Sequence, residues 1–353
     1  MKVLNVMFGK GLGGIEQAFL DYSEAMHMAG LEVFALIQPD AKIEESSLYQ
    51  FANQVIKIRN MCKWDFLAMK KIKKTLASIK PDVIVTHGNR AFTLMKKASG
   101  NKHPVVALAH NYSVKNFRRA DAVIAITEAI KMEVIKAGAK PDNVFKIPNM
   151  IKIPQSRSRT KVSDYPVIGV MGRFVKKKGF DTFIKALKEV AAAGHDFRAY
   201  IAGEGEERDD LIDLCRDLEI DKKVHFIGWV NDKKNFFSSL DIFCVPSLHE
   251  PFGIVILEAF AYNVPVITTD SEGPNEIAKH EKDALFVTKG SSKELSEALI
   301  RLLNDAALAE SLKKNALNSV QTRYDMSIIS GVIKSALIDV KEKHNSNGTR
   351  KAS

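Results

Sequence analysis

The chain has 353 residues, of which 46% are hydrophobic and 27% charged, enough for two ordinary globular domains. Its three cysteines are far apart and odd in number, which excludes a disulfide framework and a cysteine-rich zinc site and predicts a reducing, cytoplasmic setting. The formal net charge of +10 lies almost wholly in the first 150 residues, where 22 Lys and Arg face 13 Asp and Glu, so this half is expected to meet an anionic partner.

Short apolar runs alternate with helical patterns through the first half of the chain. The runs are continuous rather than alternating, which is typical of parallel strands buried on both faces. The helical patterns between them complete βαβ units. The predicted strands are residues 3–8, 32–37, 54–58, 83–87, 105–110, 122–127 and 144–148. We therefore predict a first doubly wound α/β domain over residues 1–154.

The polar segment 155–166 lacks apolar periodicity and is predicted to be a linker. The same alternation then resumes and predicts a second doubly wound α/β domain over residues 167–325. Its predicted strands are residues 167–172, 198–203, 224–228, 242–246, 265–269 and 284–287. A helix over 326–342 is expected to return to the first domain, and the polar tail 343–353 is expected to be disordered.

No apolar run reaches the roughly 20 residues of a membrane span, and the apolar start is too short for a signal peptide. Ligands of doubly wound sheets bind beyond the carboxyl ends of the strands. With two such domains, the predicted site is the cleft between them.

The loop Gly9 to Gly14 follows the first predicted strand with the G-x-G-x-x-G pattern of a dinucleotide-binding turn. NAD binding requires an acidic residue at the end of the second strand, where Gln38 stands instead, and Asp40 comes only after a proline. Glu16, in the first helical turn, is explained by the helix dipole. The glycines are therefore expected to approach a phosphate or a sugar of a ligand other than NAD.

Two cations follow the first strand of the second domain. Arg173 comes directly after Gly172, and Lys178 stands five residues further on. Cations at the carboxyl end of a strand suit a diphosphate. The alternative is a solvated basic loop.

Two carboxylates stand close together in EPFGIVILEAFA. Glu258 interrupts an apolar helix, where a carboxylate is costly to bury unless it meets hydrogen-bond donors such as ligand hydroxyls. Glu250 lies in the turn ahead of this helix. The first amides of the helix favour an anion, and they belong to Gly253, Ile254 and Val255. The alternative is a buried helix whose carboxylates bond to protein groups.

Together, GRFVKKKG, AGEGEE, FIGWV, EPFGIVILEAFA, PVITTD and GPNEI resemble the family 4 retaining glycosyltransferases. The spacing of Arg173 and Lys178 fits that family, as do the seven residues between Glu250 and Glu258. The resemblance runs from residue 1 to about residue 330. Weaker matches in the first domain are GGIE, His87 in THG, His110 in AHN, ITE at Thr127-Glu128, and Asn149 in IPN.

The resemblance implies a GT-B fold: two Rossmann-like doubly wound α/β domains facing a central cleft. It also implies a nucleotide-diphosphate sugar donor, with Glu258 on the ribose and the two cations on the diphosphate. The implied catalytic residues are His110, Arg173, Lys178 and Glu250. The implied donor-binding residues are Gly14, Gly172, Phe252, Gly253, Ile254, Val255 and Glu258.

The family chemistry implied is transfer with retention, in which the leaving phosphate takes the proton of the acceptor. Because Asp-x-Asp is absent and cations already serve the diphosphate, we expect neither a metal nor a cofactor. Two stretches depart from the family. Residues 149–152 read Asn-Met-Ile-Lys instead of Asn-Gly-Ile-Asp, which leaves the role of Asn149 open. Residues 272–274 read Glu-Gly-Pro instead of Gly-Gly-Pro, a change that bears on the choice of donor sugar.

Residues 57–80 contain eight basic residues and one acidic residue, Asp65. Helical spacing puts five apolar side chains on one side of a helix: Trp64, Leu67, Ile72, Leu76 and Ile79. A basic amphipathic helix of this kind suits an anionic membrane, whereas the alternative is a core-packed helix with a solvated lysine face. We therefore predict a lipid-linked or cell-envelope glycan acceptor, such as a lipopolysaccharide core or a polyprenyl-linked saccharide, at the inner face of the cytoplasmic membrane. Nucleic acid is excluded because aromatic residues are not interleaved with the basic ones.

Two other functions remain open for such a cleft: a nucleotide-sugar 2-epimerase and a non-catalytic sugar-nucleotide-binding subunit. An epimerase needs acid–base carboxylates around the sugar, and the first domain offers no such set that we can place. A non-catalytic subunit would usually have lost Arg173, Lys178 or Glu250, and all three are present.

Overall fold

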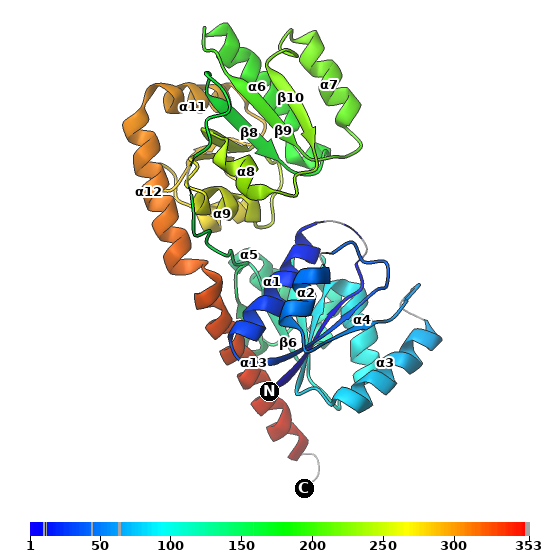
Figure 1. Cartoon of the computed structure of the whole chain (residues 1–353). Helices are drawn as coiled ribbons and strands as arrows, with labels where there is room; N and C mark the ends of the chain where they lie inside the picture. Colours follow the sequence, from blue (N-terminus) through cyan, green and yellow to red (C-terminus); the bar gives the residue numbers. More distant parts are fainter. Residues whose placement is uncertain (10, 12, 44, 63–64, 158, 350–353) are drawn as a thin grey trace. The chain divides into compact units, whose positions relative to one another are not determined.

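The computed structural model describes residues 1–9, 11, 13–43, 45–62, 65–157 and 159–349 (Figure 1). The chain forms two compact units. Unit 1 consists of Met1–Met150 and the C-terminal segment from Met326, and unit 2 consists of Ile151–Asp325.

Unit 1 is built on a seven-stranded parallel sheet in the order β3-β2-β1-β4-β5-β6-β7. Its strands are β1 (Lys2–Met7), β2 (Glu32–Ile37), β3 (Gln54–Lys57), β4 (Val83–His87), β5 (Val105–Ala109), β6 (Ala122–Ala125) and β7 (Val144–Lys146). Every residue of β4, β5 and β6 is buried, as the continuous apolar runs predict.

The helices of unit 1 are α1 (Gly14–Met28), α2 (Glu45–Phe51), α3 (Phe66–Ile79), α4 (Gly88–Ser99), α5 (Glu128–Lys136) and α13 (Met326–Thr349), with 3-10 turns η1 (Lys115–Arg119) and η2 (Pro141–Asn143). Side-chain caps start two of them. The Asp65 carboxylate accepts from the amide of Ala68 at the start of α3, and the Thr127 hydroxyl accepts from the amide of Ile130 at the start of α5.

The α13 helix, red in Figure 1, completes the core of unit 1. Its buried side chains, including Ile333 and Leu337, join Tyr22 and Met26 of α1 and the inner strands in one apolar cluster. Lys341 of α13 also forms a 2.9 Å ion pair with Asp82. The C-terminal segment is thus an integral part of unit 1.

Unit 2 is built on a six-stranded parallel sheet in the order β10-β9-β8-β11-β12-β13. Its strands are β8 (Val167–Met171), β9 (Arg198–Ala202), β10 (Val224–Gly228), β11 (Ile242–Val245), β12 (Val266–Thr269) and β13 (Leu285–Val287). Its helices are α6 (Phe180–Ala192), α7 (Arg208–Asp217), α8 (Lys233–Ser238), α9 (Ile254–Ala261), α10 (Glu272–Ile277), α11 (Ser292–Asn304) and α12 (Ala306–Arg323), with the 3-10 turn η3 (Lys176–Lys178).

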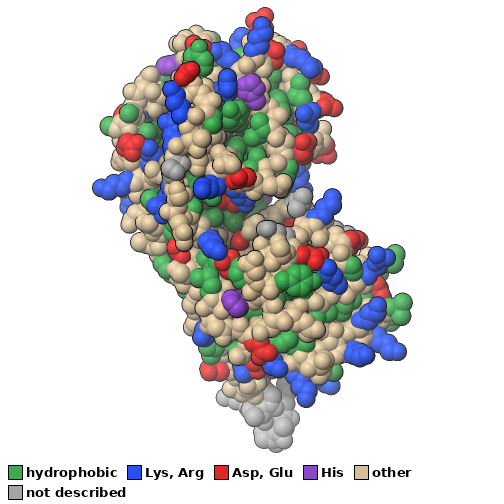
Figure 2. Space-filling view, in the orientation of Figure 1, with side chains coloured by type: hydrophobic (Ala, Val, Ile, Leu, Met, Phe, Trp, Pro, Cys, Tyr) green, Lys and Arg blue, Asp and Glu red, His purple; other side chains and the backbone are tan. Residues whose placement is uncertain are grey.

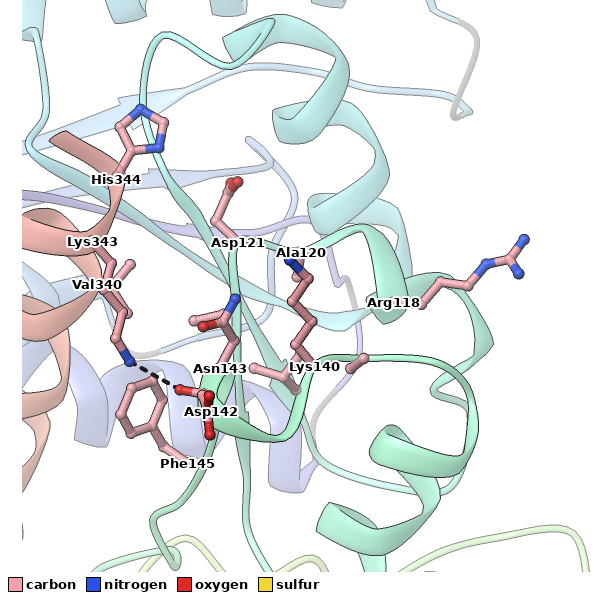
Figure 3. A pocket seen from close by; sticks show the side chains of 13 residues that line it. Arg118, Ala120, Asp121, Lys140, Asp142, Asn143, Phe145, Val340, Lys343 and His344 are labelled. Carbon is pink, nitrogen blue, oxygen red and sulfur yellow. Dashed lines mark hydrogen bonds between the residues drawn. The ribbon is translucent and has the colours of Figure 1, made fainter. Parts of the chain in front are cut away.

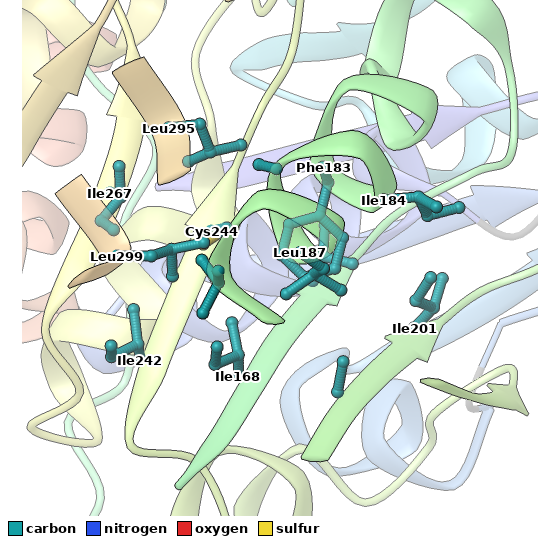
Figure 4. Packing of buried hydrophobic residues seen from close by; sticks show 14 of the residues in the cluster. Ile168, Phe183, Ile184, Leu187, Ile201, Ile242, Cys244, Ile267, Leu295 and Leu299 are labelled. Carbon is teal, nitrogen blue, oxygen red and sulfur yellow. The ribbon is translucent and has the colours of Figure 1, made fainter. Parts of the chain in front are cut away.

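The core of unit 2 lies between this sheet and helices α6 and α11. Figure 4 shows Phe183 and Leu187 of α6 beside Ile168 of β8, and Leu299 of α11 beside Ile267 of β12. These side chains are fully buried. Both units are thus doubly wound α/β domains, and the predicted fold class is confirmed.

Each sheet has one place where the strand order reverses. In unit 1 it lies between β1 and β4, and in unit 2 between β8 and β11. The loops after two such strands leave the sheet toward opposite faces and open a crevice at the carboxyl edge, where ligands of these folds bind. His87 ends β4, and Arg173 follows β8. His87 and Arg173 therefore stand at the switch points.

Two boundaries differ from the sequence-based expectation. Residues 151–166 belong to unit 2, where the amide of Thr160 donates to the carbonyl of Ser238 at 2.8 Å. Polar composition predicted a linker there, but backbone hydrogen bonds attach such a segment without apolar side chains. The predicted disordered tail instead continues α13 as far as Thr349, and residues 350–353 lie outside the described residues.

Candidate functional site

The loop after β8 is fixed against the end of β11 by Gly179. This residue has φ +66°, and a Cβ on it would lie 2.2 Å from the carbonyl oxygen of Pro246. Only glycine allows both this conformation and this approach. The amide of Leu248 also donates to the carbonyl of Lys177 at 2.8 Å. The two loops that flank the switch point are therefore held together through their backbones.

Lys178 and Glu250 meet where these loops touch. The Lys178 Nζ lies 2.5 Å from Glu250 Oε2, and the hydroxyl of Ser247 donates to the same oxygen at 3.4 Å. Glu250 is buried and Lys178 is partly exposed. An added Cβ on Gly172 would lie 3.8 Å from the Lys178 side chain, so the lysine stem passes beside the predicted donor-binding glycine. The structure thus brings together three predicted residues: Gly172, Lys178 and Glu250.

The turn into α9 is equally constrained. Gly253 has φ +93° and caps the helix, leaving the amides of Ile254 and Val255 in its first turn. A Cβ on Gly273 would lie 2.4 Å from the backbone of Phe252, and the amide of Gly273 donates to the carbonyl of Glu250 at 2.9 Å. The Gly-Pro segment of α10 therefore holds the backbone of the turn in place.

Glu258 lies one turn into α9 with only 3% of its side chain exposed. Its Oε1 accepts a 2.5 Å hydrogen bond from Lys233 Nζ. Its Oε2 is buried and has no hydrogen-bond partner among the residues that the structure describes. A buried carboxylate oxygen without a donor costs free energy, which a ligand hydroxyl would recover.

Arg173 is exposed at the start of the loop after β8, whereas Phe174 beside it is buried. The backbone here is tied to the loop after β9, because the amide of Phe174 donates to the carbonyl of Glu204 at 2.9 Å. A Cβ on Gly203 would lie 1.9 Å from the carbonyl oxygen of Gly172. Packed loops thus fix the backbone of Arg173 and leave its guanidinium accessible.

In unit 1, His110 ends a chain of buried hydrogen-bonding groups. His87 Nε2 lies 2.9 Å from Asn5 Oδ1, and His87 Nδ1 lies 3.2 Å from His110 Nε2. Burial lowers the pKa of His110 to about 4 and, with the neighbouring His110, holds the pKa of His87 well below its usual value. Both imidazoles are therefore neutral at pH 7.

The other predicted residues of unit 1 are less informative. Gly14 is exposed as the first residue of α1, and an added Cβ would meet no atom of the described residues within 4 Å. Its approach to a phosphate stays a prediction. Asn149 is buried, and within the described part of the chain its Oδ1 has no hydrogen-bond partner, which is compatible with a ligand contact at this position.

A pocket of about 350 Å³ in unit 1 lies at the amino ends of the strands rather than at the carboxyl ends (Figure 3). Ala122 and Asn143 line it at the amino ends of β6 and β7, and Lys343 Nζ donates to the carbonyl of Asp142 there at 3.0 Å. Because ligands of open α/β sheets bind at the carboxyl ends of the strands, this pocket is not part of the candidate site.

Comparison with known proteins decides the family. The family model "Glycosyl transferases group 1" matches residues 152–319, and the model "Glycosyltransferase Family 4" matches residues 12–153. The lipopolysaccharide core biosynthesis glycosyltransferase LpsE of Rhizobium meliloti is 30% identical over 345 residues, which cover 94% of this chain and 97% of LpsE. LpsD of the same organism is 31% identical over 343 residues, which cover 94% of this chain and 96% of LpsD.

The chain belongs to glycosyltransferase family 4.

The solved structures agree in fold. HepE of Anabaena, in complex with UDP and glucose, matches with a TM-score of 0.84 at 22% identity, covering 96% of this chain and 100% of HepE. The fold of this family 4 glycosyltransferase is therefore GT-B, as the motifs predict.

Sequence reasoning missed three polar partners in this glycosyltransferase. Lys233 bonds Glu258, Ser247 bonds Glu250, and Asn5 bonds His87. A signal existed for two of them. Asn5 is a single polar residue inside an apolar strand, and Lys233 follows the carboxyl end of β10. Lys233 begins α8 and Glu258 lies in α9, so their contact depends on how these two helices pack, which no local pattern reveals.

The side chains of α3 correct the prediction that its apolar side faces a membrane. The contact of its basic surface with a membrane stays a prediction. Ile72, Leu76 and Ile79 are buried in the core, so most of the predicted apolar side does not face a membrane. Trp64 lies outside the described residues. Instead, three large apolar side chains are exposed near the start of the helix, beside four exposed lysines (Figure 2). We call this set the α3 surface: Met61, Phe66, Leu67, Lys70, Lys71, Lys73 and Lys74.

The described residues contain neither a membrane-spanning helix nor a metal-binding cluster. None of the helices in the ranges given above combines the length and apolarity needed to cross a bilayer. Within the same ranges, His, Cys, Asp and Glu side chains do not gather in a group of three or more that could hold a metal ion.

Proposed function

We propose that this family 4 enzyme is a retaining hexosyltransferase that moves a sugar from a nucleotide-diphosphate sugar to a lipid-linked or cell-envelope glycan. The observation that carries the proposal is the buried Oε2 of Glu258, which has no hydrogen-bond partner among the described residues. It belongs to a helix whose N-cap, Gly253, lies beside Glu250 of the Lys178–Glu250 pair. A ribose hydroxyl supplies the donor that this oxygen lacks. HepE, with the same fold, binds UDP and glucose.

Stabilisation of the leaving group is the main catalytic task. When the anomeric bond breaks, negative charge develops on the nucleoside diphosphate. Arg173, Lys178 and the first amides of α9 are positively charged or positively polarised groups, and the glycine contacts of their loops fix the backbone that carries them. Such preorganised groups are worth about 10²–10³ in rate each.

The sugar passes through a cation-like state, as in other glycosyl transfers. In the proposed reaction the leaving phosphate oxygen takes the proton of the acceptor hydroxyl, which then attacks the same face of the sugar. Glu250, paired with Lys178, contacts the donor sugar and also limits the mobility of the lysine. We further propose that turnover needs no metal, because Arg173, Lys178 and the helix tip already provide positive charge.

The acceptor is inferred from the relatives and from charge. LpsE and LpsD act in lipopolysaccharide core biosynthesis. The α3 surface combines exposed apolar side chains with lysines, which suits the headgroup region of an anionic bilayer. We therefore propose that the enzyme works on a membrane-held glycan at the inner face of the cytoplasmic membrane, with the α3 surface in contact with lipid.

The membrane contact predicts salt-sensitive binding to vesicles. Wild-type protein is expected to float with phosphatidylglycerol-containing liposomes at low salt and to be released at high salt. Each lysine near an anionic surface is worth about 1 kcal/mol, so changing both Lys71 and Lys74 to Gln is expected to lower the partition coefficient about 10- to 30-fold.

The matched control changes Lys131 and Lys136 of α5 to Gln, which removes the same charge elsewhere on unit 1. This variant is expected to bind like the wild type. Equal binding losses in both variants would show that only net charge matters, and absence of salt-sensitive flotation in the wild type would remove the proposed lipid contact.

The activity itself is tested with a panel of UDP-, GDP- and ADP-sugars and a truncated lipopolysaccharide core as acceptor. Free nucleoside diphosphate plus an α-linked product from an α-linked donor is expected, unchanged by EDTA. An altered sugar on an intact nucleotide would indicate an epimerase. Tight donor binding without turnover would indicate a non-catalytic subunit, and an inverted linkage would contradict retention.

A further inference from the structure

The hydrogen-bond chain behind His110 has a defined direction, and its starting point is Asn5. This side chain is fully buried in β1. Its Nδ2 lies 3.2 Å from the carbonyl oxygen of Phe19 and 2.9 Å from the hydroxyl of Ser23. A carbonyl oxygen can only accept, so the amide nitrogen must face Phe19 and the oxygen must face His87.

The orientation of Asn5 determines the proton position on the next residue. Since Asn5 Oδ1 is an acceptor, His87 Nε2 at 2.9 Å carries the hydrogen. His87 is buried, with the rings of Phe19 and Tyr22 edge-on to it at 5.4 and 5.5 Å. A charged imidazolium is disfavoured in such an apolar surrounding, so His87 is neutral and its Nδ1 holds a lone pair.

The same logic extends to His110. Its Nε2 lies 3.2 Å from His87 Nδ1, and since that nitrogen is an acceptor, His110 Nε2 carries the hydrogen. The two rings lie 5.3 Å apart, with 24° between their planes. A neutral His110 in this tautomer presents a lone pair on Nδ1.

We propose that Asn5 and His87 are positioning residues that fix His110 as the neutral Nε2–H tautomer, so that His110 meets the sugar substrate as a hydrogen-bond acceptor through Nδ1. This inference rests on the proposed function for the identity of the substrate. The proposed partner of His110 is a sugar hydroxyl, which donates a hydrogen bond to Nδ1. A neutral acceptor also suits a reaction in which the sugar gains positive charge, because an imidazolium in the same place would oppose that charge.

The tautomer is read directly from ¹⁵N spectra of histidine-labelled wild-type protein at pH 7. His87 and His110 are each expected to show a protonated Nε2 and an unprotonated Nδ1, with assignments from the loss of signals in His87→Gln and His110→Asn. A protonated Nδ1 on His110, or a charged imidazolium there, would overturn the proposal. This measurement needs no substrate, so it stands apart from the success of the proposed function.

A comparison of kcat values then tests whether the hydrogen-bond chain from Asn5 through His87 to His110 matters for turnover. Gln at position 87 can donate to Asn5 and accept from His110, whereas Leu can do neither. With the sugar nucleotide that the panel identifies, H87Q is expected to stay within about threefold of wild-type kcat, and H87L is expected to lose about 10- to 100-fold. A loss of kcat equal in H87Q and H87L would overturn the positioning role.

The control for packing is Thr86→Val, next to His87 in β4. Thr86 is fully buried and donates to the carbonyl of Val106 at 2.8 Å, but it does not join the histidine chain in any hydrogen bond of the described residues. Its kcat is expected to match the wild type even where its melting temperature falls. If T86V lost as much kcat as H87L, the effect of H87L would come from sheet packing and the proposal would be overturned. If the wild type turns over no sugar nucleotide, the proposed function fails while the spectra still decide the tautomer.

Discussion

Arg173→Ala is expected to lower kcat about 10²- to 10³-fold, with a much smaller change in the KM for the sugar nucleotide. The guanidinium is exposed at the carboxyl end of β8, on a backbone fixed by the loop after β9. Its charge is most valuable when the diphosphate gains negative charge, so its loss raises the barrier more than it weakens ground-state binding. Steady-state release of nucleoside diphosphate measures both parameters.

Lys176→Ala is the matched control for this variant. Lys176 is also an exposed cation of the same loop, in the turn η3, but it does not border Glu250 in any contact described for these residues. Its kcat is expected to stay within about twofold of the wild type. A K176A defect as large as that of R173A would show a general effect of loop charge and would contradict the assigned role of Arg173.

Glu258→Ala is expected to weaken binding of the nucleoside diphosphate about 10- to 100-fold. The buried Oε2 is the acceptor that we assign to a ribose hydroxyl, and hydrogen bonds to a charged group contribute about 1.5–3 kcal/mol. Isothermal titration calorimetry with the nucleoside diphosphate measures the change. Lys233 loses this ion pair in the variant but is partly exposed, so water can solvate it.

The control for Glu258→Ala is a change in the ligand. A 2′,3′-dideoxy nucleoside diphosphate is expected to bind the wild type as weakly as the complete nucleotide binds the variant. The variant should not distinguish the two ligands, because the carboxylate that reads the hydroxyls is gone. A full additional loss with the dideoxy ligand would show that the ribose is recognised elsewhere.

Much of the fold could be predicted from the sequence because buried parallel strands have a strong signature. Runs such as VIVTH and VVALA lie in the middle of the unit 1 sheet and are buried along their whole length. Loops that follow such strands share one edge of the sheet, so the pairing of the Lys178 loop with the Glu250 loop follows from strand order.

The exposure of the α3 side chains and the length of α13 depended on tertiary packing. Periodicity placed Leu67 and Ile72 on one side of a helix, yet Ile72 is buried and Leu67 is 76% exposed. The tail is helical because α13 carries a buried face that extends to Val340, and a helix once formed adds further residues at little cost.

The hydrogen-bond partner of Glu258 also could not be predicted from the sequence. Glu258 was expected to meet hydroxyl donors, and the structure shows that Lys233 satisfies one of its oxygens, whereas the other has no partner in the ranges that the structure describes. The two residues are 25 positions apart in sequence. Only the folded sheet brings them together, so residue types alone could not separate a protein-bonded carboxylate from a ligand-binding one.

The most direct test of the account is a crystal structure of the full chain with a bound nucleoside diphosphate. We predict ribose hydroxyls within hydrogen-bond distance of Glu258 Oε2, and diphosphate oxygens on Arg173, Lys178 and the first amides of α9. A nucleotide bound away from the carboxyl edge of β8 and β11, with Glu258 Oε2 still unpaired, would contradict it.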